Sequence, residues 1–207
     1  MPTQPLQRHS AAAERNRGPI LAELQRLLPG SGLLLEVASG TGQHAAFCSA
    51  GLPGWQWLPS ERDAASLPSI SAWCSGQPRV LTPIHLDVLA TTWSQVPAQL
   101  DAVFCANLIH IAPWACCAGL MQGAARHLTT QGLLITYGPY LEDDVPTSPG
   151  NQAFDADLRA RDPAWGLRRR EDVEALAEQA GLWLRERVAM PANNLLLAWA
   201  RRRPPCA

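Results

Sequence analysis

The sequence contains no lysine, and all 17 basic residues among its 207 are arginine. This absence excludes Schiff-base catalysis, pyridoxal phosphate enzymes and P-loop nucleotide hydrolases, because each depends on a lysine amine. Charge of either sign is scarce: 17% of residues are charged and the formal net charge is −1. We therefore expect no nucleic-acid partner. Two short arginine runs, residues 168–170 and 201–203, are interpreted as solvated surface.

The sequence also lacks the spacing of a metal site and the hydrophobic run of a membrane protein. Its six cysteines show no C-x-x-C pattern and lie mostly among apolar residues. We interpret them as buried free thiols and expect no metal. No apolar stretch reaches membrane-spanning length, and no charged segment followed by an apolar run opens the chain. These features favour a cytoplasmic protein without a membrane partner. A single domain over residues 1–207 is expected, with residues 1–9 as a loose leader.

The stretch LLLEVASGTG, residues 33–42, is the most informative part of the chain. Residues 33–37 are typical of a strand, a Ser-Gly-Thr-Gly turn follows, and a helix is expected to begin near Gln43. A glycine turn between strand and helix builds a nucleotide site, because backbone N–H groups can close on the ligand. The acidic Glu36 before the glycines favours a sulfonium cofactor over a pyrophosphate. We therefore predict a site for S-adenosylmethionine (SAM).

Polar residues follow the next three expected strands. Glu61 comes 19 residues after Gly42, close to the spacing of an acidic residue that binds ribose hydroxyls. The alternative is a surface glutamate that opens a loop. Asp87 either hydrogen-bonds an adenine amino group or caps a turn. Asn107 follows the fourth strand, and His110 lies three residues further on.

Strands alternate with helices along the chain, which predicts an α/β fold with a mostly parallel sheet and an antiparallel edge. The expected strands are residues 33–37, 55–59, 80–84, 102–105, 133–137, 182–188 and 195–200, the last two forming a hairpin. A helix capped by Ser10 is expected at residues 11–16, with an interruption at Gly18-Pro19. Further helices are expected after the glycine turn and at residues 20–28, 64–74, 113–128 and 171–180. Residues 141–166 are polar and irregular, with a turn of helix near residues 154–161, and are expected to work as a lid or binding loop.

These residues resemble the class I SAM-dependent methyltransferase superfamily. Over nearly the whole chain, they are similar to the methyltransferase-like protein 26 family, also called domain-of-unknown-function family 938. The stretches that carry this resemblance are SAAAERNRGPI (10–20), EVASGTG (36–42), FCANLIHIAPW (104–114), YGPY (137–140), residues 151–155 and 161–163, and MPANN (190–194). The resemblance implies a Rossmann-like sheet of seven strands with helices on both faces. It also implies that SAM lies over the carboxyl ends of the first strands.

The resemblance further implies roles for individual residues in binding SAM. The methionine and ribose side is expected to be lined by Glu36 and by turn residues, namely Ala38, Ser39, Gly40 and Gly42. Glu61 is expected to hold the ribose, with Asp87 near adenine and Asn107 under the methionine and the transferred methyl group. Arg15 and Asn16 are candidates to reach the cofactor carboxylate.

Methyl transfer is an in-line displacement on an activated sulfonium, so an enzyme mainly aligns the reactants, an effect worth ~7–11 kcal/mol of barrier. A base is needed only where the nucleophile loses a proton. His110 is the candidate base, and the alternative is a hydrogen-bonded structural histidine. Asn107 and Tyr137 are the other candidate catalytic residues. Tyr137 either walls a substrate pocket or belongs to the core.

Two other functions remain open on the sequence alone. Gly40-x-Gly42-x-x-Ala45 also satisfies the G-x-G-x-x-G/A pattern of NAD(P) oxidoreductases. Glu36, the final hairpin and the absence of a second catalytic domain argue against that function. A non-catalytic protein that binds SAM or a protein partner is the second alternative. Our prediction is a SAM-dependent methyltransferase that acts on a small-molecule acceptor, with the acceptor atom and the oligomeric state left open.

Overall fold

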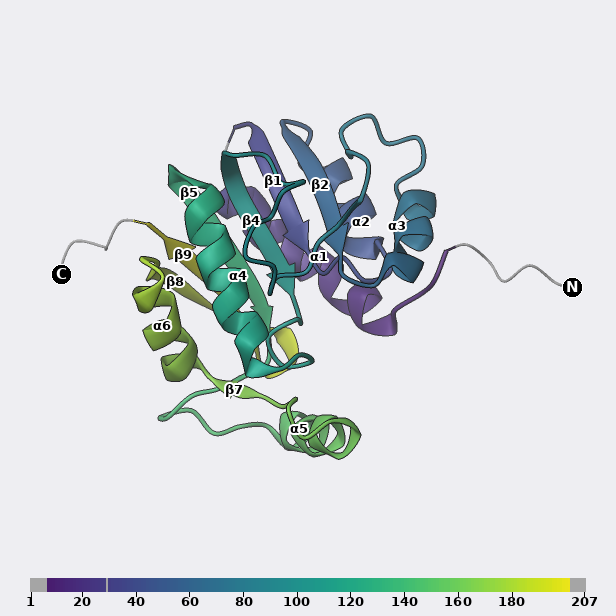
Figure 1. The fold of residues 1–207 in the computed structure, drawn as a ribbon. Coiled ribbons are helices and arrows are strands. Elements are labelled where there is room, and N and C mark those ends of the chain that lie inside the picture. The colour runs from purple at the N-terminus through teal and green to yellow at the C-terminus, as the bar shows by residue number, and fades with distance from the viewer. Residues whose placement is uncertain (1–6, 29, 202–207) are drawn as a thin grey trace, which may run out of the picture.

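The computed structural model describes residues 7–28 and 30–201. Within them, one sheet contains seven strands: β1 (Gly32–Val37), β2 (Trp55–Glu61), β3 (Ile84–His85), β4 (Leu100–Ala106), β5 (Leu128–Gly138), β8 (Trp183–Met190) and β9 (Asn194–Ala200). Their order is β3-β2-β1-β4-β5-β9-β8 (Figure 1). Neighbours from β3 to β5 are parallel, whereas β9 runs antiparallel to β5 and β8. The predicted mostly parallel sheet with an antiparallel C-terminal hairpin is confirmed.

Helices cover both faces of the sheet, as predicted. They are α1 (Ala11–Leu27), α2 (Gln43–Gly51), α3 (Leu67–Trp73), α4 (Trp114–His127), α5 (Pro149–Arg161) and α6 (Arg170–Gln179), with short 3₁₀ turns at Ala64–Ser66 and Pro191–Asn193. In Figure 1, α4 and α6 lie on the near face and α1 to α3 lie behind. A separate pair of strands, β6 (Tyr140–Leu141) and β7 (Arg168–Arg169), flanks α5 in the chain.

The central strands are apolar along both faces because helices bury each side. In β1, Leu34 and Leu35 are both fully buried but belong to different clusters, since successive side chains point to opposite faces. Leu35 belongs to the cluster that contains Leu120 from α4 and Val173 from α6, and Leu34 belongs to the cluster that contains Ile20 from α1. The sheet is therefore held between two hydrophobic layers, and the loops that could form a site lie at its carboxyl edge.

The first helix is continuous, so the predicted interruption at Gly18-Pro19 is wrong. Pro19 lies inside α1 and has no N–H to donate to the carbonyl of Arg15, a defect that costs about 3 kcal/mol in a helix interior. Ile20 and Leu24 follow at helical spacing and are fully buried in the cluster that contains α2. Burial of these side chains offsets the defect. The predicted cap is confirmed: Ser10 Oγ accepts the N–H of Ala13 at 3.3 Å.

The third strand lies at the sheet edge, as Pro83 predicts, but its bounds differ from the expected residues 80–84. It contains only Ile84–His85, because Pro83 cannot donate to a strand ladder. Val80 meets β2 through an isolated bridge with Trp57. The fifth strand begins earlier than the expected residues 133–137: β5 already starts at Leu128, and its pairing with β4 shifts register before Leu133.

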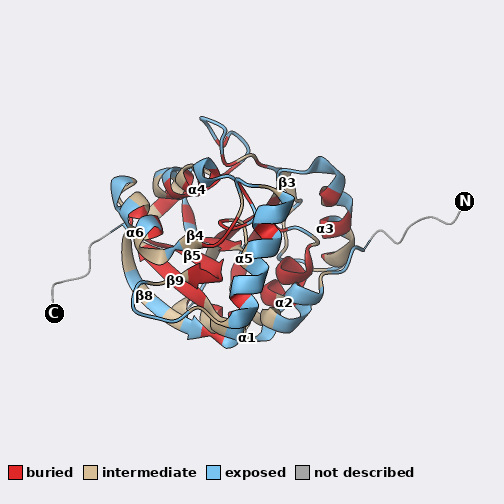
Figure 2. Ribbon diagram, turned by 90° about the horizontal axis from the view of Figure 1, so that it is seen from below, coloured by how far each residue is buried: buried red, intermediate tan, exposed pale blue. Residues whose placement is uncertain are grey.

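The segment of residues 141–166 contains a full helix, α5, rather than the single helical turn predicted. Ser148 Oγ accepts the N–H of Asn151 at 3.3 Å, and Pro149 occupies the first turn. Serine followed by proline is a helix start signal that the sequence carried. The helix lies across the carboxyl ends of β4 and β5, as Figure 2 shows from below.

Several expectations concern the ends of the chain and the cysteines. In the expected leader, Gln7 Nε2 donates to Ala72 O at 3.0 Å and the Arg8 N–H donates to Ser69 Oγ at 2.9 Å, so these two residues bind to α3. Residues 1–6, Arg202, Arg203 and Cys206 lie outside the described residues. The other five cysteines are free and buried, as predicted. Among the described residues, every helix is too short or too polar to cross a bilayer.

Candidate functional site at the carboxyl edge of the sheet

The glycine turn after β1 is built from left-handed residues. Ala38, Gly40 and Gly42 have φ values of 58°, 58° and 94°, and the Gly42 N–H donates to Ser39 O at 2.9 Å. A Cβ at Gly42 would lie 2.6 Å from Ile70 Cα, so this glycine is required where the turn meets α3. A Cβ at Gly40 would meet nothing within 4 Å. The outer side of Gly40 is therefore open.

The structure brings Glu61 to this turn. Its Oε2 accepts the Gly40 N–H at 2.8 Å, and its Oε1 accepts the N–H groups of Arg62 and Asp63 at 2.8 and 3.2 Å. The carboxylate is only partly buried. The negative charge of Glu61 thus lies beside Gly40, the glycine of this turn whose outer side is open. Such a charge repels a pyrophosphate and suits hydroxyl donors or a cation.

Asp87 caps a turn, which was one of its two predicted roles. Its Oδ1 accepts the Leu89 N–H at 2.9 Å, and its Oδ2 lies 3.3 Å from Arg62 Nε. Asp87 therefore pairs with the arginine that follows Glu61. A contact with adenine remains a prediction.

Glu36 lies beneath the turn and not at its surface. It is 2% exposed, and Trp57 Nε1 donates to its Oε2 at 2.9 Å. Burial raises the pKa of Glu36 to about 7, against hydrogen bonds from Trp57 and Ser39 that lower it, and the nearby charge of Glu61 raises it further. Glu36 thus supports the turn from below, and direct contact with a cofactor remains a prediction.

A cavity of about 630 Å³ opens at the carboxyl ends of β4 and β5. Its volume lies in the range of small-molecule sites. Its walls come from α1, the loops after β4 and β5, α5 and the turn between β8 and β9. Five predicted site residues line it: Arg15, Asn16, Asn107, His110 and Tyr137. Glu36, the glycine turn, Glu61 and Asp87 are not among the residues of its wall.

Asn107 has a strained backbone at the cavity wall. Its φ is 64°, and its N–H donates to Tyr137 O at 2.8 Å. Strained conformations of this kind cluster at functional sites. The phenol of Tyr137 faces Asn16: burial raises the pKa of Tyr137, while a hydrogen bond with Asn16 and the charge of Arg15 lower it. Asn16 Oδ1 also lies 2.8 Å from His44 Nε2, so α1 connects the cavity to the start of α2.

His110 is buried in the cavity wall and neutral at pH 7. It is 2% exposed, and burial together with the charge of Arg168 lowers its pKa to about 4. Its ring meets Phe154 of α5 edge-on at 5.8 Å. No side-chain hydrogen bond of His110 is formed within the described residues. A neutral imidazole accepts a hydrogen bond, although a pKa near 4 makes it a weak base in the free protein.

Arg168 contradicts the prediction that the first arginine run is solvated. It is partly buried and donates to Ile109 O at 3.3 Å and to Ala112 O at 3.0 Å, so it fixes the loop that carries His110. Arg170 is also partly buried and pairs with Glu142 at 3.1 Å. Within this run only Arg169 is exposed. Carbonyls of an irregular loop need donors, and a guanidinium supplies several at once.

Replacing Gly138 by alanine should displace His110. The added Cβ would lie 2.5 Å from His110 Cε1, and burial prevents the ring from moving away freely. Such overpacking should cost about 1–3 kcal/mol of the free energy of unfolding, measured by urea denaturation. Gly150→Ala is the control, because a Cβ there meets nothing within 4 Å in the first turn of α5. Equal stability of Gly138→Ala and wild type would contradict the placement of His110.

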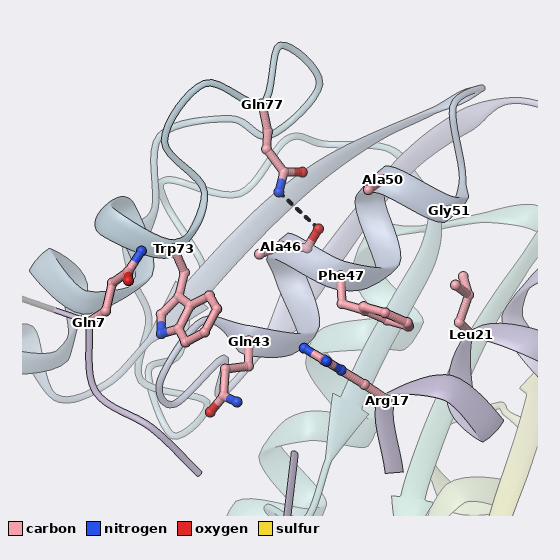
Figure 3. Close-up of a pocket in the computed structure, with 10 residues that line it drawn as sticks. All are labelled: Gln7, Arg17, Leu21, Gln43, Ala46, Phe47, Ala50, Gly51, Trp73 and Gln77. Carbon is pink, nitrogen blue, oxygen red and sulfur yellow. Dashed lines mark hydrogen bonds between the residues drawn. The ribbon is translucent and has the colours of Figure 1, made fainter. Parts of the chain in front are cut away.

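A second pocket, of about 580 Å³, lies between α1, α2 and α3. Figure 3 shows Trp73, Phe47 and Arg17 around it, with the Gln77 side chain donating to Ala46 O at 2.9 Å. The Arg17 guanidinium lies 4.6 Å from the centre of the Phe47 ring. None of the predicted site residues lines this pocket.

Sequence reasoning missed the residues that α5 and its flanks contribute to the cavity, namely Asn151, Phe154, Leu158, Arg161 and Trp165. The only signal was the expectation that residues 141–166 form a lid or binding loop. The turn between β8 and β9 also contributes, through Pro191, Ala192 and Asn194. These positions fall in the stretches 151–155, 161–163 and 190–194 or beside them, but no chemistry was assigned to them.

Solved methyltransferases share this fold. Mitomycin 7-O-methyltransferase MmcR matches with a TM-score of 0.79 at 14% identity, over 93% of this chain and 55% of that chain. Human N-acetylserotonin methyltransferase in complex with SAM matches with a TM-score of 0.77 at 14% identity, over 92% of this chain and 52% of that chain. An O-methyltransferase family 2 protein from Planctomyces limnophilus in complex with apigenin matches with a TM-score of 0.72 at 17% identity, over 91% of this chain and 59% of that chain. The chain thus spans between 52% and 59% of the length of these proteins.

Sheet order, helix layers and these matches together define a methyltransferase-like fold. Identities of 14–17% establish the fold and nothing finer. The chain belongs to the family described as "Protein of unknown function (DUF938)", whose family model matches residues 7–201.

Proposed function

We propose that the protein binds SAM at the carboxyl ends of β1, β2 and β4 and transfers its methyl group to a small molecule in the cavity. The observation that carries this proposal is the hydrogen bond from the Gly40 N–H to the Glu61 carboxylate, at a glycine whose outer side is open. The human neighbour of the same fold binds SAM in its solved structure, and the Planctomyces neighbour binds apigenin. Both facts support a SAM site with a small acceptor beside it.

The residues present fit the charges of SAM. Glu61 provides acceptors for ribose hydroxyls at the turn, and its charge favours a cationic ligand over a pyrophosphate. Arg15 lines the cavity and has no ion-pair partner within the described residues, so it is available for the methionine carboxylate.

The chemistry needs alignment more than proton transfer. SAM supplies an activated methyl group, so the chain's own residues mainly orient the acceptor and exclude water. Asn107 and Tyr137 offer polar atoms at the wall, and the raised pKa of Tyr137 keeps it protonated as a donor. His110 is neutral and accepts a hydrogen bond from an acceptor hydroxyl. The hydroxyl becomes strongly acidic as its oxygen gains the methyl group. Even a base with a pKa near 4 then takes the proton.

Glu61→Ala tests the proposed cofactor site. It removes a charged acceptor, so SAM affinity should fall at least about tenfold, measured by calorimetry. Asp63→Ala is the matched control, because it removes the same charge two residues away, where the carboxylate accepts from Ala65 and Ser66. Unchanged SAM affinity in Glu61→Ala would remove Glu61 from the site.

Incubation with methyl-labelled SAM and a mixed metabolite extract tests turnover. Wild type should transfer label to a small molecule, and Glu61→Ala should not do so at the same SAM concentration. Binding of SAM without transfer to any metabolite would instead indicate a non-catalytic protein of this fold.

A further inference from the structure

The charged side chains in the wall of the cavity are all positive. Among the residues of its wall, the charged side chains are Arg15, from α1, and Arg161, from α5, and no aspartate or glutamate is present. The rest of the wall is largely apolar and contains three aromatic side chains: Tyr137, Phe154 and Trp165. Two arginines in a wall that contains no carboxylate attract an anion.

Arg161 is poorly paired within the protein. Its nearest carboxylate is Asp157, with 3.8 Å between Nη1 and Oδ2, and the two side chains are 58% and 63% exposed. A contact of this length and exposure contributes little. The guanidinium lies 5.2 Å from the centre of the Trp165 ring, a cation–π contact that orients it. Its hydrogen-bond donors therefore remain available to a ligand.

One face of α5 connects this arginine to the end of the cavity where His110 lies. Phe154, Leu158 and Arg161 follow at helical spacing and line the cavity together. Phe154 contacts His110, and Arg161 lies two turns further along the helix, about 10 Å away along its axis. An elongated, flat ligand fits between them.

We propose that the methyl acceptor is an aromatic acid whose carboxylate binds Arg161 and whose ring packs against Phe154 and Trp165. This inference rests on the proposed function, in which the SAM carboxylate takes Arg15 and leaves Arg161 for the acceptor. A planar guanidinium binds a carboxylate through two parallel hydrogen bonds. The separation along α5 places the reacting hydroxyl across the ring from the carboxylate, near His110.

The test compares acids with their neutral isosteres in the presence of S-adenosylhomocysteine, the demethylated product of SAM. The probes are 4-hydroxybenzoate and 4-hydroxycinnamate, each paired with its carboxamide, and the readout is the dissociation constant from calorimetry or ligand-observed NMR. Wild type should bind each acid at least about tenfold more tightly than its amide. Arg161→Gln should remove this preference and leave amide binding unchanged.

Arg159→Gln is the matched control. Arg159 lies on the same helix but pairs with Asp155, with 2.9 Å between Nε and Oδ2, and does not line the cavity. This variant should retain the preference for acids. Thermal unfolding of both variants checks that α5 remains folded.

Each outcome decides one proposal. No preference for acids in wild type, a preference that survives Arg161→Gln, or one that Arg159→Gln also removes, would overturn the assignment of Arg161. A separate calorimetric titration of S-adenosylhomocysteine into each protein reports on the cofactor site alone. If that heat is absent while the acid preference depends on Arg161, the proposed function fails and the anion site stands.

Discussion

Gly40→Ala should abolish measurable SAM binding and leave the protein folded. A Cβ at Gly40 meets no protein atom within 4 Å, so the substitution adds only the strain of a left-handed alanine, about 1–2 kcal/mol. The same methyl group would stand on the open side of the turn, where we propose that the cofactor lies. SAM affinity should fall more than about tenfold, measured by calorimetry on protein whose unfolding midpoint is determined in parallel.

Gly42→Ala provides the contrast. Its Cβ would lie 2.6 Å from the Cα of Ile70, and its φ of 94° is also unfavourable for alanine. Overpacking against the backbone of α3 adds to the strain, so the free energy of unfolding should fall by about 3 kcal/mol. If Gly40→Ala binds SAM as tightly as wild type, the open side of the turn is not the cofactor site.

Glu36→Gln should make the protein's stability less dependent on pH. The folded-state pKa of Glu36 is raised from 4.5 to about 7, chiefly by burial. A raised pKa means that the folded protein prefers the protonated acid. Its stabilising contribution is therefore complete below pH 4.5 and is lost as the pH rises through 7. Across this window, wild type should lose about 3 kcal/mol relative to Glu36→Gln, because each pKa unit is worth about 1.4 kcal/mol.

The glutamine keeps an oxygen for the Trp57 N–H, so the comparison isolates the charge. Urea unfolding at several pH values between 4.5 and 8 measures the difference between the two proteins. His44 and His110, whose pKa values are lowered to about 4, change stability in the opposite direction as the pH falls, but equally in both proteins. Glu178→Gln, on an exposed position of α6, should show no such divergence from wild type. A constant difference between wild type and Glu36→Gln would mean that folding does not raise the pKa of Glu36.

The parts of the fold that local sequence determines were predictable. The apolar run around Leu34 and Leu35 is typical of a strand buried on both faces, and the glycines after it permit the left-handed turn that the structure shows. The spacing from Gly42 to Glu61 located a carboxylate that the structure brings to Gly40. These features depend on periodicity, backbone conformation and chain length, each of which can be deduced from the sequence.

Features that depend on tertiary contacts were not predictable. Pro19 looked like a helix break because the burial of Ile20 and Leu24 in the cluster that contains α2 is not visible in the sequence. Arg168 looked like surface because nothing in its run indicates that it donates to Ile109 and Ala112. The role that we propose for Arg161 depends on the position of α5 across the sheet edge, which brings Arg161 into the cavity wall.

Isothermal calorimetry of the wild-type protein with SAM tests the central claim most directly, with NADH titrated under the same conditions. The account predicts a saturable heat with one site for SAM and for its demethylated product, and no heat for NADH. Saturable NADH binding without SAM binding, or no heat with any of the three, would contradict it.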